Sequence, residues 1–283
     1  MVDETENSSL IFIPWDHEIR DTIFSLKLDY APGTDGFNNK FFQQHWDVIH
    51  LDVCKLVKSL FRNGFLPHGL NDQFLTLIPK VDNASEIHQF RPIVLINTLF
   101  KIIAKILDNR LSPIYNKIVS WNQFGFIKGR SIQDCIYLAS ECTNSLNKVT
   151  RGGNVAIKLD IRNSFDTIDW SFIFKVLEGF GFNDTFIKTI KTLFNSASLS
   201  ILVNGTPRGF FKCTKGVRQG DPLSEILFVI AEDYLSRLLS HLVNQNKLKP
   251  INAARNLRVP THLLYADDII LFLQGDQKKY PSS

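Results

Sequence analysis

The stretch from Thr261 to Gln274, THLLYADDIILFLQ, constrains the fold of this chain more than any other part of it. Two apolar runs flank the centre Ala266-Asp267-Asp268, and aliphatic and β-branched runs around a short acidic centre predict a tight β-hairpin. Two carboxylates about 4 Å apart repel by roughly 4 kcal/mol at an effective dielectric constant near 20. An acidic pair at the tip of an apolar hairpin therefore indicates a cation site. The alternative is a solvated Asp-Asp turn, because aspartate is a common turn residue.

Composition limits the class of protein. A chain of 283 residues with 44% hydrophobic residues can bury a large core, and its 23 phenylalanines exclude a disordered chain. No run of about 18 apolar residues occurs, so we expect no membrane span. The N-terminus is acidic and has no apolar signal region, and the four cysteines form no CxxC pair and no zinc-ligand spacing. These features predict an intracellular protein, nuclear or cytoplasmic, with reduced thiols.

Positive charge is concentrated in one part of the chain. The net charge is only +4, but residues 80–130 hold eight basic residues against three acidic ones. Such a block suits a polyanion, for example a nucleic acid or a triphosphate. A solvated helix face is the alternative, and charge alone does not decide between the two.

The first half of the chain alternates predicted helices with two short strands. Helices are expected at 40–62, 99–119 and 131–147, and strands at 74–80 and 93–96. Gly64 is expected to end the first helix and Ser131 to cap the third. The sequence Arg151-Gly152-Gly153 then predicts a subdomain boundary.

The second half contains another carboxylate at the end of a strand. Residues 154–160 alternate as a strand does and end in Asp160. Asp169 is expected to cap a helix, a second helix should span 184–194, and Asn204-Gly205 predicts a hairpin with strands at 200–203 and 209–213. A glycine-rich loop at 215–220, which alone is a weak phosphate signal, precedes a helix at 222–242. This order predicts an antiparallel sheet with helices packed on one face and both carboxylate sites at one edge.

Several segments together resemble a known family. The segments 158–170 (KLDIRNSFDTIDW), 215–228 (KGVRQGDPLSEILF) and 265–268 (YADD) resemble the palm motifs of reverse transcriptases. Residues 77–80 (LIPK) and 90–93 (FRPI) resemble the finger motifs. Residues 32–37 and 122–131 resemble further segments of the non-LTR (LINE-type) retrotransposon polymerases, most closely those of plants. The motifs occur in the family's order over residues 31–274, which makes chance agreement implausible.

The resemblance implies a fold and an activity. The fold would be α+β, the fingers and palm of a right-hand reverse transcriptase, with an antiparallel palm sheet that has helices on one face and with no thumb. Residues 1–70 would be a lead-in and helix, 71–150 the fingers, and 151–283 an incomplete palm. The activity would be that of an RNA-directed DNA polymerase, a nucleotidyltransferase that adds dNTPs to the 3′-hydroxyl of a DNA primer on an RNA template.

The resemblance also implies a metal site. Asp160, Asp267 and Asp268 would be catalytic and would ligate two Mg²⁺ ions, with Mn²⁺ as a substitute. Carboxylates suit Mg²⁺ because it prefers hard oxygen ligands. One ion would activate the primer hydroxyl and the other would steady the leaving pyrophosphate.

Five further residues would bind the nucleotide. Lys80 and Arg91 resemble residues that hold the incoming triphosphate through charge-assisted hydrogen bonds, with a solvated strand end and a surface arginine as alternatives. Phe165 resembles the aromatic gate that excludes a 2′-hydroxyl, with a core phenylalanine as the alternative. Gln219 and Gly220 resemble the loop that contacts template and nucleotide.

The chain also departs from the family pattern. Asn163-Ser164 stands where the family usually has Lys-Ala, and Glu225 where it has Pro; neither change touches a proposed metal ligand. We expect the thumb and the upstream endonuclease of the parent polyprotein to be absent, so that this chain alone has weak activity or none. Two alternatives remain: a non-catalytic, maturase-like nucleic-acid-binding remnant, and an unrelated metal-dependent enzyme with a carboxylate hairpin. The joint presence of the three aspartates with Lys80 and Arg91 favours the polymerase.

Overall fold

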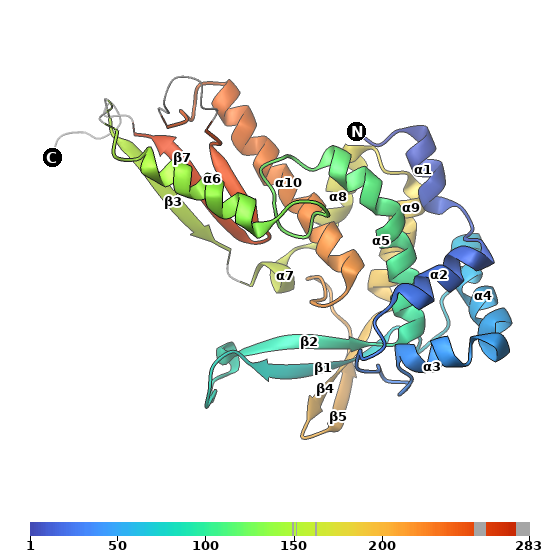
Figure 1. Cartoon of the computed structure of the whole chain (residues 1–283). Helices are drawn as coiled ribbons and strands as arrows, with labels where there is room; N and C mark the ends of the chain where they lie inside the picture. Colours follow the sequence, from blue (N-terminus) through green and yellow to red (C-terminus); the bar gives the residue numbers. More distant parts are fainter. Residues whose placement is uncertain (149, 151, 162, 252–258, 276–283) are drawn as a thin grey trace. The chain divides into compact units, whose positions relative to one another are not determined.

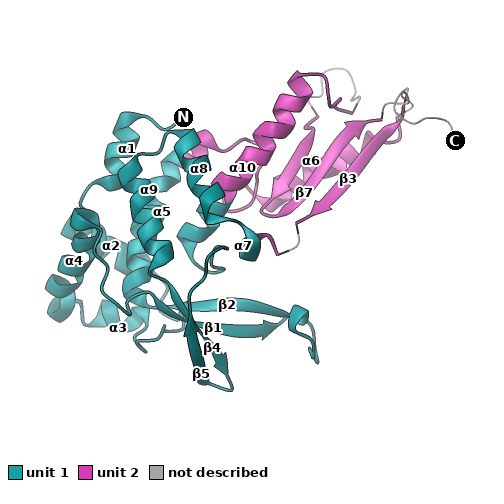
Figure 2. Ribbon diagram, turned by 180° about the vertical axis from the view of Figure 1, so that it is seen from behind, with its two compact units in different colours: residues 1–114, 165–228 teal, residues 115–164, 229–283 magenta. Residues whose placement is uncertain are grey.

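The structure is a computed structural model that describes residues 1–148, 150, 152–161, 163–251 and 259–275. Two units make up the chain: unit 1 contains residues 1–114 and 165–228, and unit 2 contains residues 115–164 and 229–283 (Figure 2). Each unit is therefore built from two separate pieces of sequence. The assignment of fingers and palm to residues 71–150 and 151–283 stays a prediction.

Unit 1 begins with four helices: α1 (Glu4–Ile11), α2 (Asp16–Ser25), α3 (Asn39–Gln44) and α4 (Trp46–Asn63). The single helix predicted at 40–62 is divided at His45, which ends α3 and precedes α4. Gly64 ends α4 as predicted, and its φ of +67° is the left-handed conformation that glycine adopts without a steric penalty.

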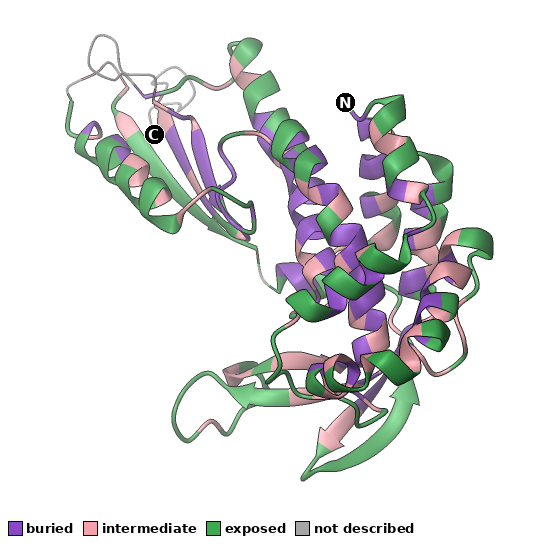
Figure 3. Cartoon of the chain, turned by 45° about the vertical axis from the view of Figure 1, so that its right-hand side comes forward, coloured by how far each residue is buried: buried purple, intermediate pink, exposed green. Residues whose placement is uncertain are grey.

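A four-stranded mixed sheet follows in unit 1. Its strands are β1 (Asp72–Pro79), β2 (Phe90–Ile96), β4 (Ser198–Val203) and β5 (Thr206–Phe211), in the order β2-β1-β4-β5, and a short 3₁₀ helix, η1 (Ile87–Gln89), precedes β2 (Figure 1). Strands β1 and β4 pair in parallel, and the other neighbours are antiparallel. β5 is exposed along its whole length (Figure 3).

The hairpin predicted at Asn204-Gly205 is confirmed, and both turn residues have positive φ, as a two-residue hairpin turn favours. Its location differs from the expectation. The sequence predicted that this hairpin would lie in the same sheet as Asp160, but β4 pairs with β1 in unit 1. Pairing between strands this far apart in sequence leaves no local signal. The return strand starts at Thr206 rather than Gly209, because pairing resumes directly after the two turn residues.

The remaining helices follow the predicted pattern closely, except for a short helix at 164–167 that the sequence did not predict. They are α5 (Thr98–Ile118), α6 (Ile132–Asn144), α7 (Ser164–Thr167), α8 (Trp170–Phe180), α9 (Asp184–Asn195) and α10 (Pro222–Asn244). The predicted caps Ser131 and Asp169 each accept a hydrogen bond from a backbone N–H of the first helical turn, and Asp221 does the same at the start of α10. Among the described residues, none of these helices combines the length and apolar character needed to cross a bilayer.

Unit 2 holds a three-stranded antiparallel sheet in the order β3-β7-β6. The strands are β3 (Asn154–Asp160), β6 (His262–Tyr265) and β7 (Asp268–Gln274). Leu263 and Phe272 pack with residues of α6, whereas Ile269 and Leu271 pack with Leu235 and Leu239 of α10. The α+β fold class is confirmed, but helices cover both faces of this sheet rather than one. The unbroken apolar run of β7 explains this, because side chains alternate between the faces and both sets need cover.

Candidate active site

The predicted carboxylate hairpin is present in unit 2. Tyr265 of β6 pairs with Asp268 of β7, so Ala266 and Asp267 alone form the connection between the strands. Ala266 has a φ of +52° and is buried. The left-handed conformation costs a residue with a Cβ roughly 1–2 kcal/mol. The residue just before the two aspartates is therefore held in an unfavourable backbone conformation.

The register of the sheet brings Asp160 to the hairpin. Asp160, the last residue of β3, lies directly opposite Asp268, the first residue of β7. Directly opposed residues of an antiparallel pair point to the same face of the sheet, with Cβ atoms about 4.5–5.5 Å apart. Both residues are exposed. Like charges in this arrangement are destabilising unless a cation lies close to them.

The hairpin carboxylates already have partners. Lys158 Nζ lies 3.0 Å from Asp268 Oδ1, and the hydrogen bond between these side chains raises the pKa of Lys158. Ser164 Oγ donates to Asp267 Oδ2 over 3.0 Å. The side chains of Lys158 and Asp268 are 66% and 59% exposed, so solvent screens this ion pair and its contribution to stability is small.

The three predicted ligands have the chemistry that a magnesium site needs, but they are not arranged as a metal-binding group. All three predicted ligands offer hard carboxylate oxygens, as Mg²⁺ requires. Within the described part of the chain, however, no group of three or more His, Cys, Asp or Glu side chains is arranged to hold a metal ion. The pairing of Asp160 with Asp268 is present, and the convergence of all three carboxylates stays a prediction.

Residues 120–125 support strand β6, a role that the sequence did not reveal. Phe124 N donates to Leu264 O over 2.8 Å, and Leu264 N donates to Asn122 O over 2.9 Å. The segment thus adds a short parallel bridge to the free side of β6. The resemblance of residues 122–131 to the family pointed to this segment but assigned it no function.

Helix α10 holds the same region from another side. Asp233 accepts hydrogen bonds from Ser120 N (2.8 Å) and Arg237 Nε (2.7 Å). Ser236 Oγ lies 2.7 Å from His262 Nε2 and 2.7 Å from Ser120 Oγ. Burial lowers the pKa of His262 to about 4, so the imidazole is neutral at physiological pH. The base of the hairpin is therefore fixed by buried and partly buried hydrogen bonds.

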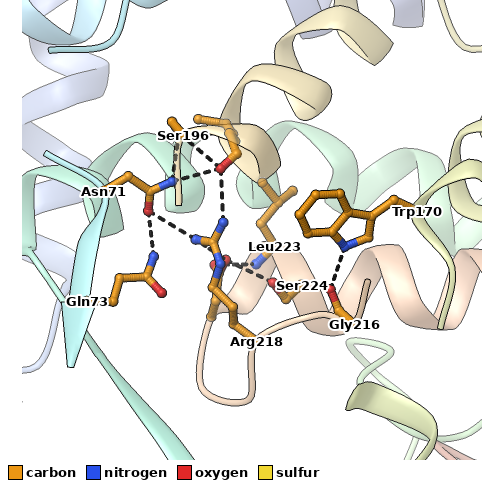
Figure 4. Close-up of polar contacts among 10 residues, drawn as sticks. Asn71, Gln73, Trp170, Ser196, Gly216, Arg218, Leu223 and Ser224 are labelled. Carbon is orange, nitrogen blue, oxygen red and sulfur yellow. Dashed lines mark hydrogen bonds and ion pairs between the residues drawn. The ribbon is translucent and has the colours of Figure 1, made fainter. Parts of the chain in front are cut away.

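In unit 1, the glycine-rich loop is anchored by Arg218 (Figure 4). Its guanidinium donates to Asn71 Oδ1 over 3.2 Å and to Leu193 O over 3.0 Å, and it lies over the ring of Phe100. Asp221, 3.9 Å away, completes the cluster and caps α10. Arg218 stands in the segment that resembles the family, but its anchoring role depends on Asn71, just before β1, and on α9, and it has no local signal.

The start of the loop is locked onto residues 165–170. Gly216 N donates to Ile168 O over 2.7 Å, and Trp170 Nε1 donates to Gly216 O over 2.7 Å (Figure 4). A Cβ at Gly216 would lie 2.7 Å from Asp166 O, so only glycine fits. Beside the loop lies a cavity of about 240 Å³, lined mainly by apolar side chains together with Asp166, Arg218, Gln219 and others.

The five predicted nucleotide-binding residues all lie in unit 1. Lys80, exposed just beyond β1, donates from Nζ to His88 O over 3.1 Å, and Arg91 is exposed on β2 opposite Ile78. Gln219 lines the cavity, and Gly220 is exposed with a φ of +95°.

Phe165 is the most buried of the five. It is 8% exposed, and its ring stacks on Phe228 with centroids 4.2 Å apart. This packing is what the core alternative expects, and the role of Phe165 as a sugar gate stays a prediction.

Comparison with known proteins agrees with the resemblance. Residues 78–280 match the sequence model of the family described as reverse transcriptase (RNA-dependent DNA polymerase). The chain is 30% identical over 246 residues to the transposon TX1 uncharacterized 149 kDa protein of Xenopus laevis, covering 86% of this chain and 18% of that protein. It is 28% identical over 251 residues to the Pol polyprotein of the retrotransposable element R2DM of Drosophila melanogaster, covering 88% of this chain and 22% of that polyprotein.

A third relative is the RNA-directed DNA polymerase from the mobile element jockey of Drosophila funebris, 23% identical over 264 residues, with 91% of this chain and 27% of that protein covered. The chain thus spans about a fifth to a quarter of the length of these relatives. The part of this chain that matches them includes residues of both unit 1 and unit 2. On the match over residues 78–280, this chain belongs to the reverse transcriptase family.

Proposed function

We propose that this chain is the polymerase region of a LINE-type retrotransposon polyprotein, which adds dNTPs to a primer 3′-hydroxyl on an RNA template. The observation that carries the proposal is the register that sets Asp160 opposite Asp268, next to the turn that bears Asp267. Asp160 and the adjacent pair Asp267-Asp268, which are distant in the sequence, belong to the same end of one sheet. Membership of the reverse transcriptase family supports nucleotidyl transfer as the reaction.

Asp160, Asp267 and Asp268 would hold Mg²⁺, or Mn²⁺ in its place. Bound divalent ions would supply charge stabilisation for the phosphoryl group and lower the pKa of the attacking hydroxyl. The contacts that Asp267 and Asp268 make within the chain leave these carboxylates available to bind a metal ion. Lys158 and Ser164 engage Asp268 and Asp267 through single contacts, of which the ion pair is largely exposed and can exchange for another partner.

Unit 1 would supply the nucleotide contacts. Lys80 and Arg91 are exposed cations suited to a triphosphate, and Gln219 is carried by a loop whose backbone is fixed at Gly216 and Arg218. RNA template, DNA primer and dNTPs are the partners that this proposal implies. An intracellular location, nuclear or cytoplasmic, would follow from these partners.

Single-nucleotide extension of a DNA primer on an RNA template tests the proposal. The 283-residue chain should add the complementary dNTP in Mg²⁺ or Mn²⁺, and a slow rate suffices because variants are compared with one another. Asp267→Asn should remove the activity. The matched control is Asp184→Asn, the same change at an exposed residue of α9, which should not affect the rate.

Two outcomes would contradict the proposal. If Asp267→Asn extends the primer as fast as the Asp184→Asn control, the hairpin is not the reactive centre. If the chain binds primer and template but adds no nucleotide in either metal, even when it is continued through a family thumb, the chain is a non-catalytic nucleic-acid-binding protein.

A further inference from the structure

The turn that carries the aspartates needs external support. Ala266 has a φ of +52°, and its methyl side chain offers no hydrogen bond that could stabilise the turn locally. A left-handed residue other than glycine, asparagine or aspartate persists when surrounding structure holds it there. The direction of the backbone that leaves Ala266 sets where Asp267 and Asp268 point.

The side-chain amide of Gln123 contacts both polar backbone groups of Ala266. Gln123 Oε1 accepts from Ala266 N over 3.1 Å, and Gln123 Nε2 lies 3.5 Å from Ala266 O. The same Oε1 accepts from Gly125 N over 2.8 Å, which fixes the amide to its own segment. Gln123 is 1% exposed, so water does not compete for these contacts.

Gly125 allows this close approach. A Cβ at Gly125 would lie 2.3 Å from Ala266 N, a distance at which no side chain fits. The segment that carries Gln123 therefore lies directly against the turn. This steric observation is independent of the hydrogen bonds and identifies the same contact.

Glu232 of α10 sets the orientation of the Gln123 amide. An amide has a donor end and an acceptor end that can exchange places, so its partners decide which end meets Ala266 N. Gln123 Nε2 donates to Glu232 Oε2 over 2.7 Å, which leaves Oε1 to accept from Ala266. Glu232 is 7% exposed, and its other oxygen, Oε1, is buried without a hydrogen-bond partner among the described residues. An acid with an unsatisfied buried oxygen costs stability, which argues for a role other than packing.

We propose that Gln123 is a positioning residue for the carboxylate hairpin, and that its amide, oriented by Glu232, holds Ala266 in the left-handed conformation that directs Asp267 and Asp268. The inference rests on the proposed function, because it concerns the orientation of the same carboxylates. A misplacement of about 1 Å at a reacting group can cost roughly 100-fold in rate. Loss of this support should therefore lower kcat more than it changes KM.

The first test replaces Gln123 with a residue of similar shape that makes no hydrogen bond. Gln123→Met should lower kcat for single-nucleotide addition at least about 10-fold, with KM for the dNTP within about twofold. The matched control is Gln133→Met, the same change at an exposed residue of α6. Glu232→Leu should resemble Gln123→Met, and the conservative variant Glu232→Gln, which keeps an acceptor for Gln123 Nε2, should restore most of kcat.

A second readout needs no activity. Hydrogen exchange of the Ala266 amide, followed by NMR on ¹⁵N-alanine-labelled chain, should accelerate at least about 10-fold in Gln123→Met and Glu232→Leu but not in Gln133→Met or Glu232→Gln. Adding Ala266→Gly to Gln123→Met tests the mechanism, because glycine takes positive φ without a penalty. The loss of kcat caused by Gln123→Met should then be smaller than in the Ala266 background.

The outcomes separate this inference from the proposed function. If Asp267→Asn abolishes addition while Gln123→Met changes neither kcat nor Ala266 exchange, the positioning role is overturned and the active site stands. If Ala266 exchange responds as expected while Asp267→Asn has no effect on addition, Gln123 does hold the turn, and the proposed function is overturned. Equal losses of kcat in Glu232→Gln and Glu232→Leu would overturn the role of Glu232 in orienting the Gln123 amide.

Discussion

The glycine-rich loop of unit 1 and the carboxylate hairpin of unit 2 are held in opposite ways. In the loop the functional segment is itself fixed: the side chain of Arg218 is 11% exposed and donates to Asn71 and Leu193. In the hairpin the base and the turn backbone are fixed by His262 and Gln123. At the tip, Asp268 forms an exposed ion pair and Asp267 accepts from the buried Ser164. The loop is therefore held by contacts of its own side chains, whereas the hairpin combines a supported turn backbone with an exposed ion pair at Asp268 that can exchange for another partner.

Buried oxygen atoms without a hydrogen-bond partner occur in both regions. Among the described residues these include Gln73 Oε1, beside the Arg218 cluster, and Glu232 Oε1, beneath the hairpin. The first belongs to a neutral amide. The second belongs to an acid, and burial, with a contribution from the charge of Asp267, raises the pKa of Glu232 to about 8. Burial also raises the pKa of Asp221 in the loop anchor, where Arg218 opposes the shift, so both supports contain an acid whose pKa is raised by burial.

The largest expected effect comes from removing the loop anchor. Arg218→Met leaves Asp221 and Asn71 Oδ1 without their buried cationic partner, and breaking a buried ion pair typically costs about 3–5 kcal/mol. We expect a loss of this size in the free energy of unfolding of unit 1. Urea titration with pulsed hydrogen exchange and mass spectrometry measures it, because peptides of the two units are read separately.

Arg208→Met is the control for this prediction, since Arg208 is an exposed arginine of β5 in the same unit. It should change the urea midpoint of unit 1 peptides only slightly. Equal shifts in the two variants would show that the buried contacts of Arg218 do not hold the loop.

A smaller effect is expected at the base of the hairpin when the pH falls. The pKa of His262 is lowered from 6.5 to about 4, so its proton binds more tightly in the unfolded chain. The contribution of neutral His262 is complete above pH 6.5 and is lost as the pH falls toward 4, by about 3 kcal/mol in total. His262→Gln should remove this dependence, as judged from the urea midpoint of unit 2 peptides.

Comparison at equal pH is essential for this measurement. Glu232 acts in the opposite direction, because its raised pKa makes unit 2 lose stability as the pH rises from 4.5 toward 8. The difference between wild type and His262→Gln cancels that contribution. His241→Gln, an exposed histidine of α10, serves as the control, and a pH-dependent difference of the same size there would refute the assignment to His262.

The smallest effect concerns the exchangeable partner at the tip. Lys158→Met removes the cation that lies 3.0 Å from Asp268 and should tighten Mn²⁺ binding only about twofold to fivefold, because solvent screens an exposed ion pair. The control is Lys175→Met on α8, in unit 1. Weaker Mn²⁺ binding in Lys158→Met would mean that Lys158 supports the carboxylates rather than competing with the metal.

Local features of the fold were predictable because local chemistry determines them. The Asn204-Gly205 turn, the Asp169 cap and the hairpin around Ala266 depend on residues a few positions apart. The joining of β4 to β1 was not predictable, because the parallel pairing of Ser198 with Asp72 depends on long-range packing. The helices on both faces of the unit 2 sheet could have been inferred from the unbroken apolar run of β7.

The candidate site was predictable in its residues but not in its support. Asp160 and Asp268 lie at strand ends in recognisable motifs, and the register brings them together. Gln123 and Glu232 have no such signal, because a glutamine in a loop and an acid on an apolar helix are both common. Their function depends on contacts between segments more than a hundred residues apart, which only the folded chain shows.

The most direct test of this account is a Mn²⁺ titration of the 283-residue chain, followed by electron paramagnetic resonance of the free ion. We expect weak binding by the wild-type chain that is lost in Asp160→Asn, because Asp160 and Asp268 are the two carboxylates that the sheet sets face to face. Asp134→Asn, the same change at an exposed residue of α6, should bind as the wild type does. Identical titrations for wild type and Asp160→Asn would contradict the claim that these paired carboxylates are the metal-binding centre of the chain.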